Sequence, residues 1–212
     1  MEEYTRANPA LWNTLKFVLP VSSQIHDVKH REAPTFEELK SILPYLMESK
    51  FTGDRALAMG ILTVGRATEF RAAKWDEIDL QNAIFTVPPA RRKDCNKEAF
   101  LVPLSTQTVD MLSSLNQSNE LVFPGRKGTK PITTTSILHN IKKWLPNHYR
   151  VTVHGIRSTF SDWCADNGKD FNTKEMSLMH AVGNAVTRAY QRTNLLEPRR
   201  VLMQEWADAL LA

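Results

Sequence analysis

The sequence predicts an α+β fold that is mainly α-helical and carries one small antiparallel β-sheet. Most apolar residues recur at helical spacing over long segments. Only two short runs are rich in β-branched and aromatic residues, and a basic turn joins them. With 212 residues, of which 42% are hydrophobic and 24% charged, the chain is long enough to bury a core.

The first predicted helix begins at a capping box. Thr35 is the expected N-cap and Glu38 follows three residues later, so each side chain can bond the backbone N–H of the other residue. The helix is expected to run to about Met47, where Pro44 kinks or shortens it.

Further helical segments follow along the chain. They are expected over 54–64, as a turn over 68–74, over 106–115, over 133–144, from His154 onward with breaks near Gly168 and Gly183, and over 195–211. In the last of these, Leu202, Trp206 and Leu210 form an apolar stripe. This stripe is expected to dock either on its own domain or on a neighbouring protomer.

The two predicted strands cover 83–87 and 99–103. Pro88-Pro89 ends the first strand, and a turn rich in arginine and lysine leads to the second. A third short strand or extended piece is expected over 121–124, followed by a basic loop over 125–130.

Composition and charge exclude several classes of protein. The net charge is +4 and the pI is about 9.1, which permits a polyanionic partner without requiring one. No apolar run is long enough to span a membrane, and the start does not resemble a signal peptide. Cys95 and Cys164 lack metal-ligand spacing, so neither zinc nor a disulfide framework is implied and a reduced, cytoplasmic compartment fits.

One candidate pair follows the second predicted helix. Arg66 comes just after the helix end, three residues before Glu69. The carboxylate can hold the guanidinium toward a phosphate, which arginine clamps with two hydrogen bonds. Taken alone, the pair is more simply explained as a surface ion pair.

Four more candidates lie in the C-terminal third. His154 and Arg157 are three residues apart at a helix start, so both can face one site, and the helix dipole favours an anion there. His180 stands in an apolar setting that also suits a core histidine. Tyr190 can act as a nucleophile when a base and cations assist it, although tyrosine at helical spacing is most often packing.

Basic side chains gather in two turns. Each turn also fits a solvated charged surface, but either can contact a DNA backbone, and Lys93, or failing it Lys97, is a candidate proton donor. The candidates for DNA contact are Arg91, Arg92, Lys97, Arg126, Lys127 and Lys130.

Taken together, these residues resemble the catalytic set of the tyrosine recombinase (phage integrase) family. The pattern is an arginine followed by an acidic residue, a hairpin lysine, H-x-x-R, a second histidine, and a tyrosine about ten residues later. The segments Ala73–Asp79, Val102–Ser105, Val122–Pro124 and Arg199–Asp208 resemble the subgroup of prophage and genomic-island integrases related to the phage P4 enzyme. The likeness covers about 32–212. The order Thr-Val-Gly-Arg66 and a slightly long hairpin depart from the family pattern.

The resemblance implies the catalytic-domain fold of these enzymes and DNA cleavage without a metal or other cofactor. Tyr190 would attack the scissile phosphate, and Arg66 and Arg157 would neutralise its oxygens. His180 would donate a hydrogen bond and His154 would act as the base. Lys93 would protonate the leaving oxygen.

The resemblance also implies an organisation and partners. Residues 1–31 would be an interdomain linker at the end of a missing N-terminal region, and 32–212 the catalytic domain. The partners would be double-stranded DNA attachment sites, an excisionase and a DNA-bending host factor. The chain would form a homotetramer on DNA, or remain a monomer as an isolated domain, near the bacterial nucleoid and away from membranes.

Two other functions remain open on the sequence. A type IB topoisomerase also uses a tyrosine with cationic helpers, although the H-x-x-R spacing and the tail favour a recombinase. A DNA-binding relic without catalysis is the second alternative, and the complete set of six catalytic residues argues against it.

Overall fold

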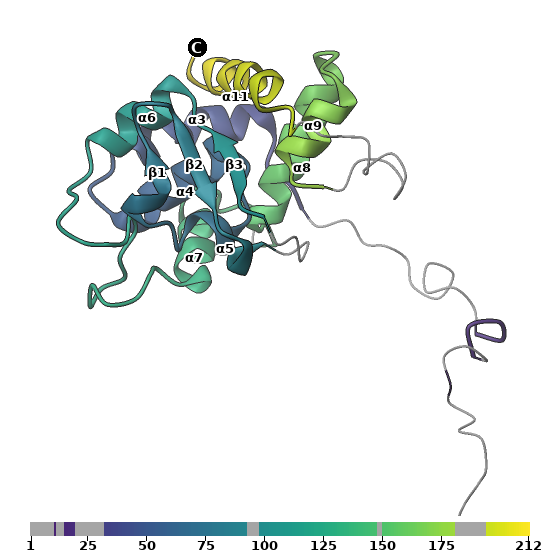
Figure 1. Ribbon diagram of the computed structural model, residues 1–212, viewed down its shortest axis with the longest axis horizontal. Helices are drawn as coiled ribbons and strands as arrows, with labels where there is room; N and C mark the ends of the chain where they lie inside the picture. Colours follow the sequence, from purple (N-terminus) through teal and green to yellow (C-terminus); the bar gives the residue numbers. More distant parts are fainter. Residues whose placement is uncertain (1–10, 12–14, 20–31, 93–97, 148–149, 181–193) are drawn as a thin grey trace, which may run out of the picture. The chain divides into compact units, whose positions relative to one another are not determined.

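The computed structural model describes residues 11, 15–19, 32–92, 98–147, 150–180 and 194–212. The chain divides into two compact units, Met1–His30 and Arg31–Ala212. The helices and strands that follow all lie in the second unit (Figure 1).

The second unit is mostly helical and contains one three-stranded antiparallel sheet, as the sequence predicted. Its helices are α3 (Phe36–Glu48), α4 (Thr52–Thr63), α5 (Ala67–Phe70), α6 (Thr106–Ser113), α7 (Thr134–Trp144), α8 (Val153–Asp166), α9 (Phe171–Ser177) and α11 (Leu196–Leu211). Its strands are β1 (Ile78–Asp79), β2 (Ile84–Val87) and β3 (Phe100–Pro103), with short 3₁₀ turns at Trp75–Glu77 and Pro89–Arg91.

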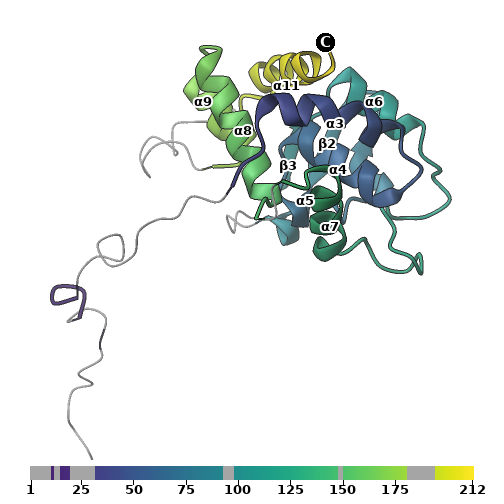
Figure 2. The ribbon, with the colours of Figure 1, turned by 180° about the vertical axis from the view of Figure 1, so that it is seen from behind.

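Helix α3 begins at the predicted capping box. The backbone N–H of Glu38 donates to the Thr35 hydroxyl at 3.2 Å, and the Glu38 carboxylate accepts from the Thr35 N–H at 2.8 Å. Pro44 lies inside the helix, which nevertheless continues to Glu48. Seen from behind in Figure 2, α3 lies across α4 and beside α8 and α11.

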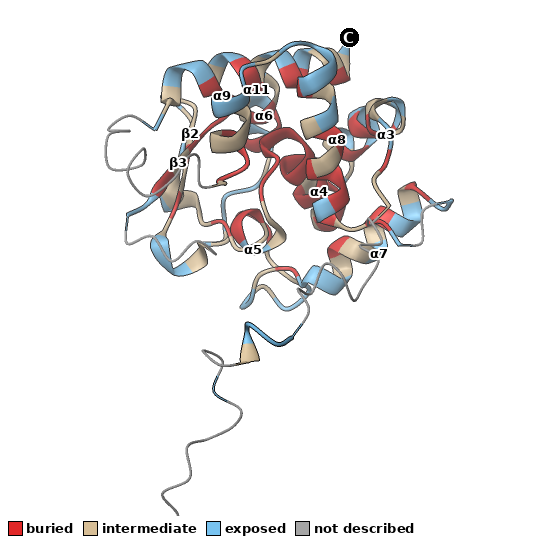
Figure 3. Ribbon diagram, turned by 90° about the vertical axis from the view of Figure 1, so that its right-hand side faces the viewer, coloured by how far each residue is buried: buried red, intermediate tan, exposed pale blue. Residues whose placement is uncertain are grey.

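Helix α4 forms the centre of the core. Ten of its twelve residues are buried, and Figure 3 shows most of its ribbon in the colour of buried residues. Gly60 allows a close approach, because a Cβ at this position would stand 2.6 Å from the Phe70 ring of α5. This close packing holds the C-terminal end of α4 against α5, next to the turn that leads to the candidate site.

The sheet has the order β1-β2-β3, and Phe85 of β2 pairs with both Ile78 and Val102. The third strand is β1, not the segment 121–124 that the sequence favoured. That segment makes only isolated bridges, Lys74 with Leu121 and a proline pair at 124 and 131. The residues beside the prolines hold the second bridge: the Ile132 N–H donates to the Phe123 carbonyl at 3.0 Å, and the Gly125 N–H donates to the Lys130 carbonyl at 2.8 Å.

The C-terminal helix α11 packs on its own domain, one of the two arrangements that the sequence left open. Trp206 is fully buried and donates from Nε1 to the Ile61 carbonyl at 2.9 Å. Its ring meets Phe160 and Trp163 edge-on. Arg199, 1% exposed, donates to the carbonyls of Leu101 and Asn194, and so joins the start of α11 to β3.

Candidate active site

The turn between α4 and α5 presents the first site residue, Arg66. Val64 adopts a left-handed conformation with φ 47°, and Arg66 then becomes the N-cap of α5. One oxygen of the Glu69 carboxylate accepts from the Arg66 backbone N–H at 2.7 Å, and the other pairs with Nη1 at 3.0 Å. The Glu69 side chain is 1% exposed and the Arg66 side chain is 22% exposed. A buried carboxylate therefore holds the guanidinium, which remains partly exposed to solvent.

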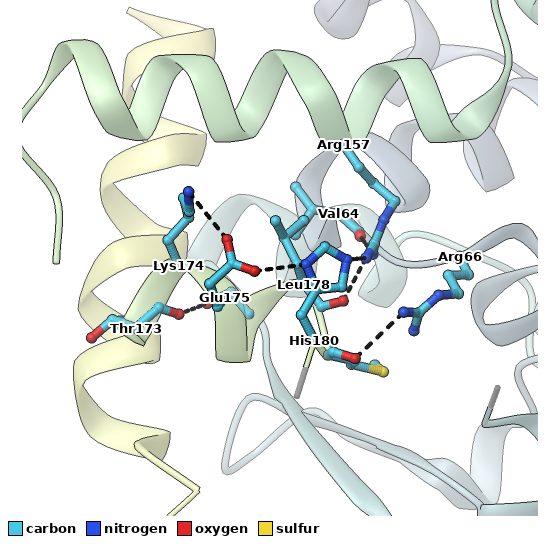
Figure 4. Close-up of polar contacts among 10 residues, drawn as sticks. Val64, Arg66, Arg157, Thr173, Lys174, Glu175, Leu178 and His180 are labelled. Carbon is cyan, nitrogen blue, oxygen red and sulfur yellow. Dashed lines mark hydrogen bonds and ion pairs between the residues drawn. The ribbon is translucent and has the colours of Figure 1, made fainter. Parts of the chain in front are cut away.

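Arg157 occupies the second turn of α8 and is buried. Its Nη1 donates to the Val64 carbonyl at 2.5 Å, and its Nη2 donates to the Leu178 carbonyl. The same Nη2 lies 3.2 Å from Nε2 of His180. One guanidinium thus connects the end of α4 with the end of α9 (Figure 4).

His180 follows the end of α9 and points its two ring nitrogens at different partners. Nδ1 lies 2.8 Å from the Glu175 carboxylate, and Nε2 faces Arg157. Met179, just before it, has φ 51°, a left-handed conformation that is costly for a residue with a side chain. This turn directs the Met179 carbonyl to 3.4 Å from Nη2 of Arg66.

The two arginines bring two positive charges into this site. Burial, and then the nearby positive charge of Arg66, lowers the pKa of Arg157 to about 10, so the guanidinium stays charged at neutral pH. Among the described residues its direct partners are two carbonyls and an imidazole, none of which carries a negative charge. The carboxylates of Glu69 and Glu175 favour the charged form of Arg157 through space, while each pairs with another side chain, and a phosphate would add a directly bonded negative charge.

The structure therefore brings together Arg66, Glu69, Arg157 and His180. His154 is exposed in the first turn of α8, three residues before Arg157. The other three candidates, Lys93, Lys97 and Tyr190, lie outside the described residues. Their expected roles stay predictions.

The two arginines of the β2–β3 turn are held within the domain. The guanidinium of Arg91 donates to the Ala72 carbonyl and pairs with the Glu77 carboxylate, and its side chain is 16% exposed. Arg92 donates to the Glu98 carbonyl at 2.8 Å. The partners of Arg91 explain a basic residue here without DNA, so we do not include it among the DNA contacts proposed for this chain.

The basic loop between α6 and α7 is exposed. Gly125 and Lys130 close it through a backbone hydrogen bond of 2.8 Å, and Gly128 adopts φ 75°, a conformation that favours glycine. The loop presents three exposed cationic side chains, those of Arg126, Lys127 and Lys130. They remain candidates for phosphate contact.

Neither a metal site nor a membrane-spanning helix is found within the described ranges. No three His, Cys, Asp or Glu side chains there gather closely enough to hold a metal ion. No helix in the same ranges is long and apolar enough to cross a membrane. Cys164 is buried, and burial raises the pKa of its thiol to about 12.

The sequence did not reveal two parts of this site. One is Glu175, whose only signal is its place five residues before His180 at the end of a helix. The other is the pair of backbone carbonyls, at Val64 and Leu178, that hold Arg157. Carbonyls are present at every residue, so no sequence pattern marks them.

Comparison with known proteins places the chain in a family. The model of the phage integrase family matches residues 34–196. The chain belongs to the phage integrase family. It is 34% identical to prophage integrase IntA of Escherichia coli (strain K12) over 195 residues, and this match covers 85% of the chain and 46% of the relative.

A second relative is the integrase of Enterobacteria phage P4, 30% identical over 173 residues, with 73% of this chain and 39% of the relative covered. The chain thus spans less than half the length of these two integrases.

Solved structures share the fold at lower identity. The integrase from mycobacterium phage Brujita matches with a TM-score of 0.61 and 17% identity, over 85% of this chain and 59% of that one. The Tn1549 transposon integrase bound to transposon right end DNA matches with a TM-score of 0.58 and 16% identity, over 91% and 70%. XerA recombinase matches with a TM-score of 0.56 and 20% identity, over 92% and 70%.

Proposed function

We propose that this chain is the catalytic domain of a site-specific tyrosine recombinase, an integrase that cuts and rejoins double-stranded DNA at attachment sites. The convergence of Arg66, Arg157 and His180 carries the proposal. These side chains come from three distant segments and meet in one site, where Arg66 pairs with Glu69 and His180 with Glu175. Family membership and the similarity to prophage integrases point to integration or excision of a prophage or genomic island.

The proposed reaction is a transesterification. The Tyr190 oxygen attacks the scissile phosphorus, a 3′-phosphotyrosyl bond forms, and the 5′ oxygen leaves and takes up a proton. A 5′-hydroxyl from the partner DNA then attacks the phosphotyrosine and releases the tyrosine. One phosphodiester is exchanged for another at each step, so neither a nucleotide nor a metal is required.

The site residues take distinct roles in this step. Arg66 and Arg157 stabilise the negative charge that gathers on the non-bridging oxygens, an effect worth about 10²- to 10³-fold in rate for each donor. His154 is the base for Tyr190, and Lys93, or Lys97 in its place, protonates the leaving oxygen.

His180 donates a further hydrogen bond from Nε2. In the absence of DNA this nitrogen accepts from Arg157, so it must first gain a proton.

DNA affinity is assigned to the basic turns. Arg126, Lys127 and Lys130 are exposed, and phosphate contacts from such side chains give binding that weakens as salt rises. Arg92 and Lys97 complete the proposed set.

The rest of the longer protein is also a proposal. Residues 1–31 would link this domain, 32–212, to an N-terminal region that binds DNA. The whole protein would act near the bacterial nucleoid, as a homotetramer on its attachment sites, with an excisionase and a DNA-bending host factor as partners.

A covalent trap tests this proposal. A nicked duplex that spans the attachment site lets the short 5′-hydroxyl strand diffuse away after cleavage, so the phosphotyrosyl intermediate accumulates. We expect a slow protein–DNA band on a denaturing gel, also in the presence of a chelator. The Tyr190→Phe variant should bind the same duplex and give no band. An adduct that survives this substitution would refute the assignment of Tyr190.

A further inference from the structure

Glu175 holds His180 at two points. Its backbone carbonyl accepts from the His180 N–H at 2.9 Å, and its carboxylate lies 2.8 Å from Nδ1 of the ring. The neighbouring residues Leu178 and Met179 are buried, so the end of α9 is anchored in the core. The backbone and side-chain contacts together fix the direction of the imidazole (Figure 4).

The chemistry of the two partners decides which ring nitrogen carries the proton. An ionised carboxylate only accepts hydrogen bonds, and a guanidinium only donates them. Glu175 therefore requires a proton on Nδ1 of His180, and Arg157 requires a lone pair on Nε2. The DNA-free chain holds the Nδ1–H tautomer between these two groups.

Glu175 is suited to this task because it remains ionised. Burial raises the pKa of its carboxyl, but hydrogen bonds from His180 and Lys174 outweigh that effect and keep the pKa below its ordinary value. The Lys174 ammonium lies 3.1 Å from the second carboxylate oxygen, so each oxygen has its own partner.

We propose that Glu175 is a positioning residue for His180, and that it keeps Nε2 directed at Arg157 and at the phosphate that Arg157 binds. This inference rests on the proposed recombinase function. The Nδ1–H bond to Glu175 is the same whether Nε2 accepts from Arg157 or, once protonated, donates to a phosphate. The orientation of the ring is therefore preserved between the DNA-free and reacting states.

Two substitutions separate this role from simple packing. Glu175→Ala removes the acceptor, and we expect single-turnover cleavage at saturating DNA to fall about 10- to 100-fold, the loss seen when the carboxylate that orients a metal-bound histidine is removed. The dissociation constant for DNA should change by less than about twofold, because Glu175 contacts His180 and not DNA. Glu175→Gln retains an acceptor oxygen and should recover most of the lost rate.

Lys174→Met provides the matched control. It removes the other partner of the Glu175 carboxylate, keeps the aliphatic stem, and leaves the contact with His180 in place. The hydrogen bond from His180, the largest of the effects that lower the pKa of Glu175, remains, so the carboxylate should stay ionised at neutral pH and the cleavage rate should stay close to that of the wild type. An Ala variant that cleaves like the wild type, or a Gln variant as slow as the Ala variant, would overturn the proposal.

A second measurement does not depend on cleavage. In chain labelled with ¹⁵N-histidine, the Nδ1 proton of His180 should give a downfield, slowly exchanging signal that is absent in His180→Gln and in Glu175→Ala. Absence of this signal from the wild type would overturn the positioning role. If the signal is present but the wild type forms no adduct, the recombinase function fails while the Glu175–His180 contact stands.

Discussion

Arg157 donates from Nη1 to the carbonyl of Val64, 93 positions earlier in the chain, at 2.5 Å. Its other terminal nitrogen reaches the Leu178 carbonyl, so a single buried guanidinium joins the turn that presents Arg66 to the turn that presents His180. The relative placement of these two groups therefore depends on Arg157, which we propose also binds the scissile phosphate.

The first prediction concerns Arg157→Lys. A lysine keeps the charge but cannot reach both carbonyls with a planar fork, so one buried carbonyl loses its partner. We expect stability to fall by about 1–3 kcal/mol and cleavage by at least about 100-fold. Urea denaturation and single-turnover cleavage measure the two effects. Arg150→Lys, the same substitution at an exposed position, is the control. Equal cleavage by Arg157→Lys and Arg150→Lys would contradict the account.

The second prediction separates the basic loop from the β2–β3 turn. Lys127→Ala and Lys130→Ala should weaken DNA binding, and each should lower the slope of log K against log salt by about 1. Arg91→Ala should leave that slope unchanged and reduce stability instead, because Arg91 pairs with Glu77. Binding titrations at several salt concentrations provide the test, and an altered slope for Arg91→Ala would make it a DNA contact after all.

The third prediction concerns pH and the cap of α9. The backbone N–H of Thr173, and then its hydroxyl, bond the Asp170 carboxylate and lower the pKa of Asp170. The folded state therefore favours the ionised form. This contribution to stability is complete above the ordinary pKa of about 4 and is lost as pH falls through the lower folded value.

The Asp170→Asn variant does not titrate and isolates this effect. The difference in unfolding free energy between wild type and variant should be constant above about pH 5 and should shrink as the pH falls below about 4. Denaturant titrations across this range measure it. A difference that does not depend on pH would show that the charge of Asp170 does not stabilise the cap.

The fourth prediction concerns the docking of α11. Trp206→Phe keeps an aromatic ring but leaves the buried Ile61 carbonyl without its donor, at a cost of about 1–3 kcal/mol. Trp206→Ala should cost about 3–5 kcal/mol. Val201→Ala, at an exposed position of the same helix, should change stability by less than about 0.5 kcal/mol. Urea denaturation should find Val201→Ala the most stable of the three, Trp206→Phe intermediate and Trp206→Ala the least stable. A Phe variant as stable as the wild type would contradict the role of the hydrogen bond.

The sequence predicted those helices whose signals lie within a short stretch of the chain. The capping box at Thr35 and the apolar spacing of α4 and α11 each identified a helix, because both signals lie within one element. Strand β1 was missed, since Ile78–Asp79 is too short to show an alternating pattern.

Partners from distant segments were not predictable in the same way. The pair Arg66–Glu69 lies within one turn and was visible as a spacing. Arg91 was predicted as a DNA contact because its neighbours are basic, and its partner Glu77, 14 residues earlier, was not visible as a spacing. The hold of Arg157 on two backbone carbonyls exists only after α4, α8 and α9 have packed.

The most direct test of the central claim is the chemical identity of the protein–DNA linkage. The trapped adduct is digested with a protease and the DNA-bound peptide is identified by mass spectrometry. We predict a peptide containing Tyr190, joined through its oxygen to a 3′-phosphate, with a free 5′-hydroxyl on the other DNA end. DNA attached to another residue, or through a 5′-phosphate, would contradict the recombinase mechanism proposed for this chain.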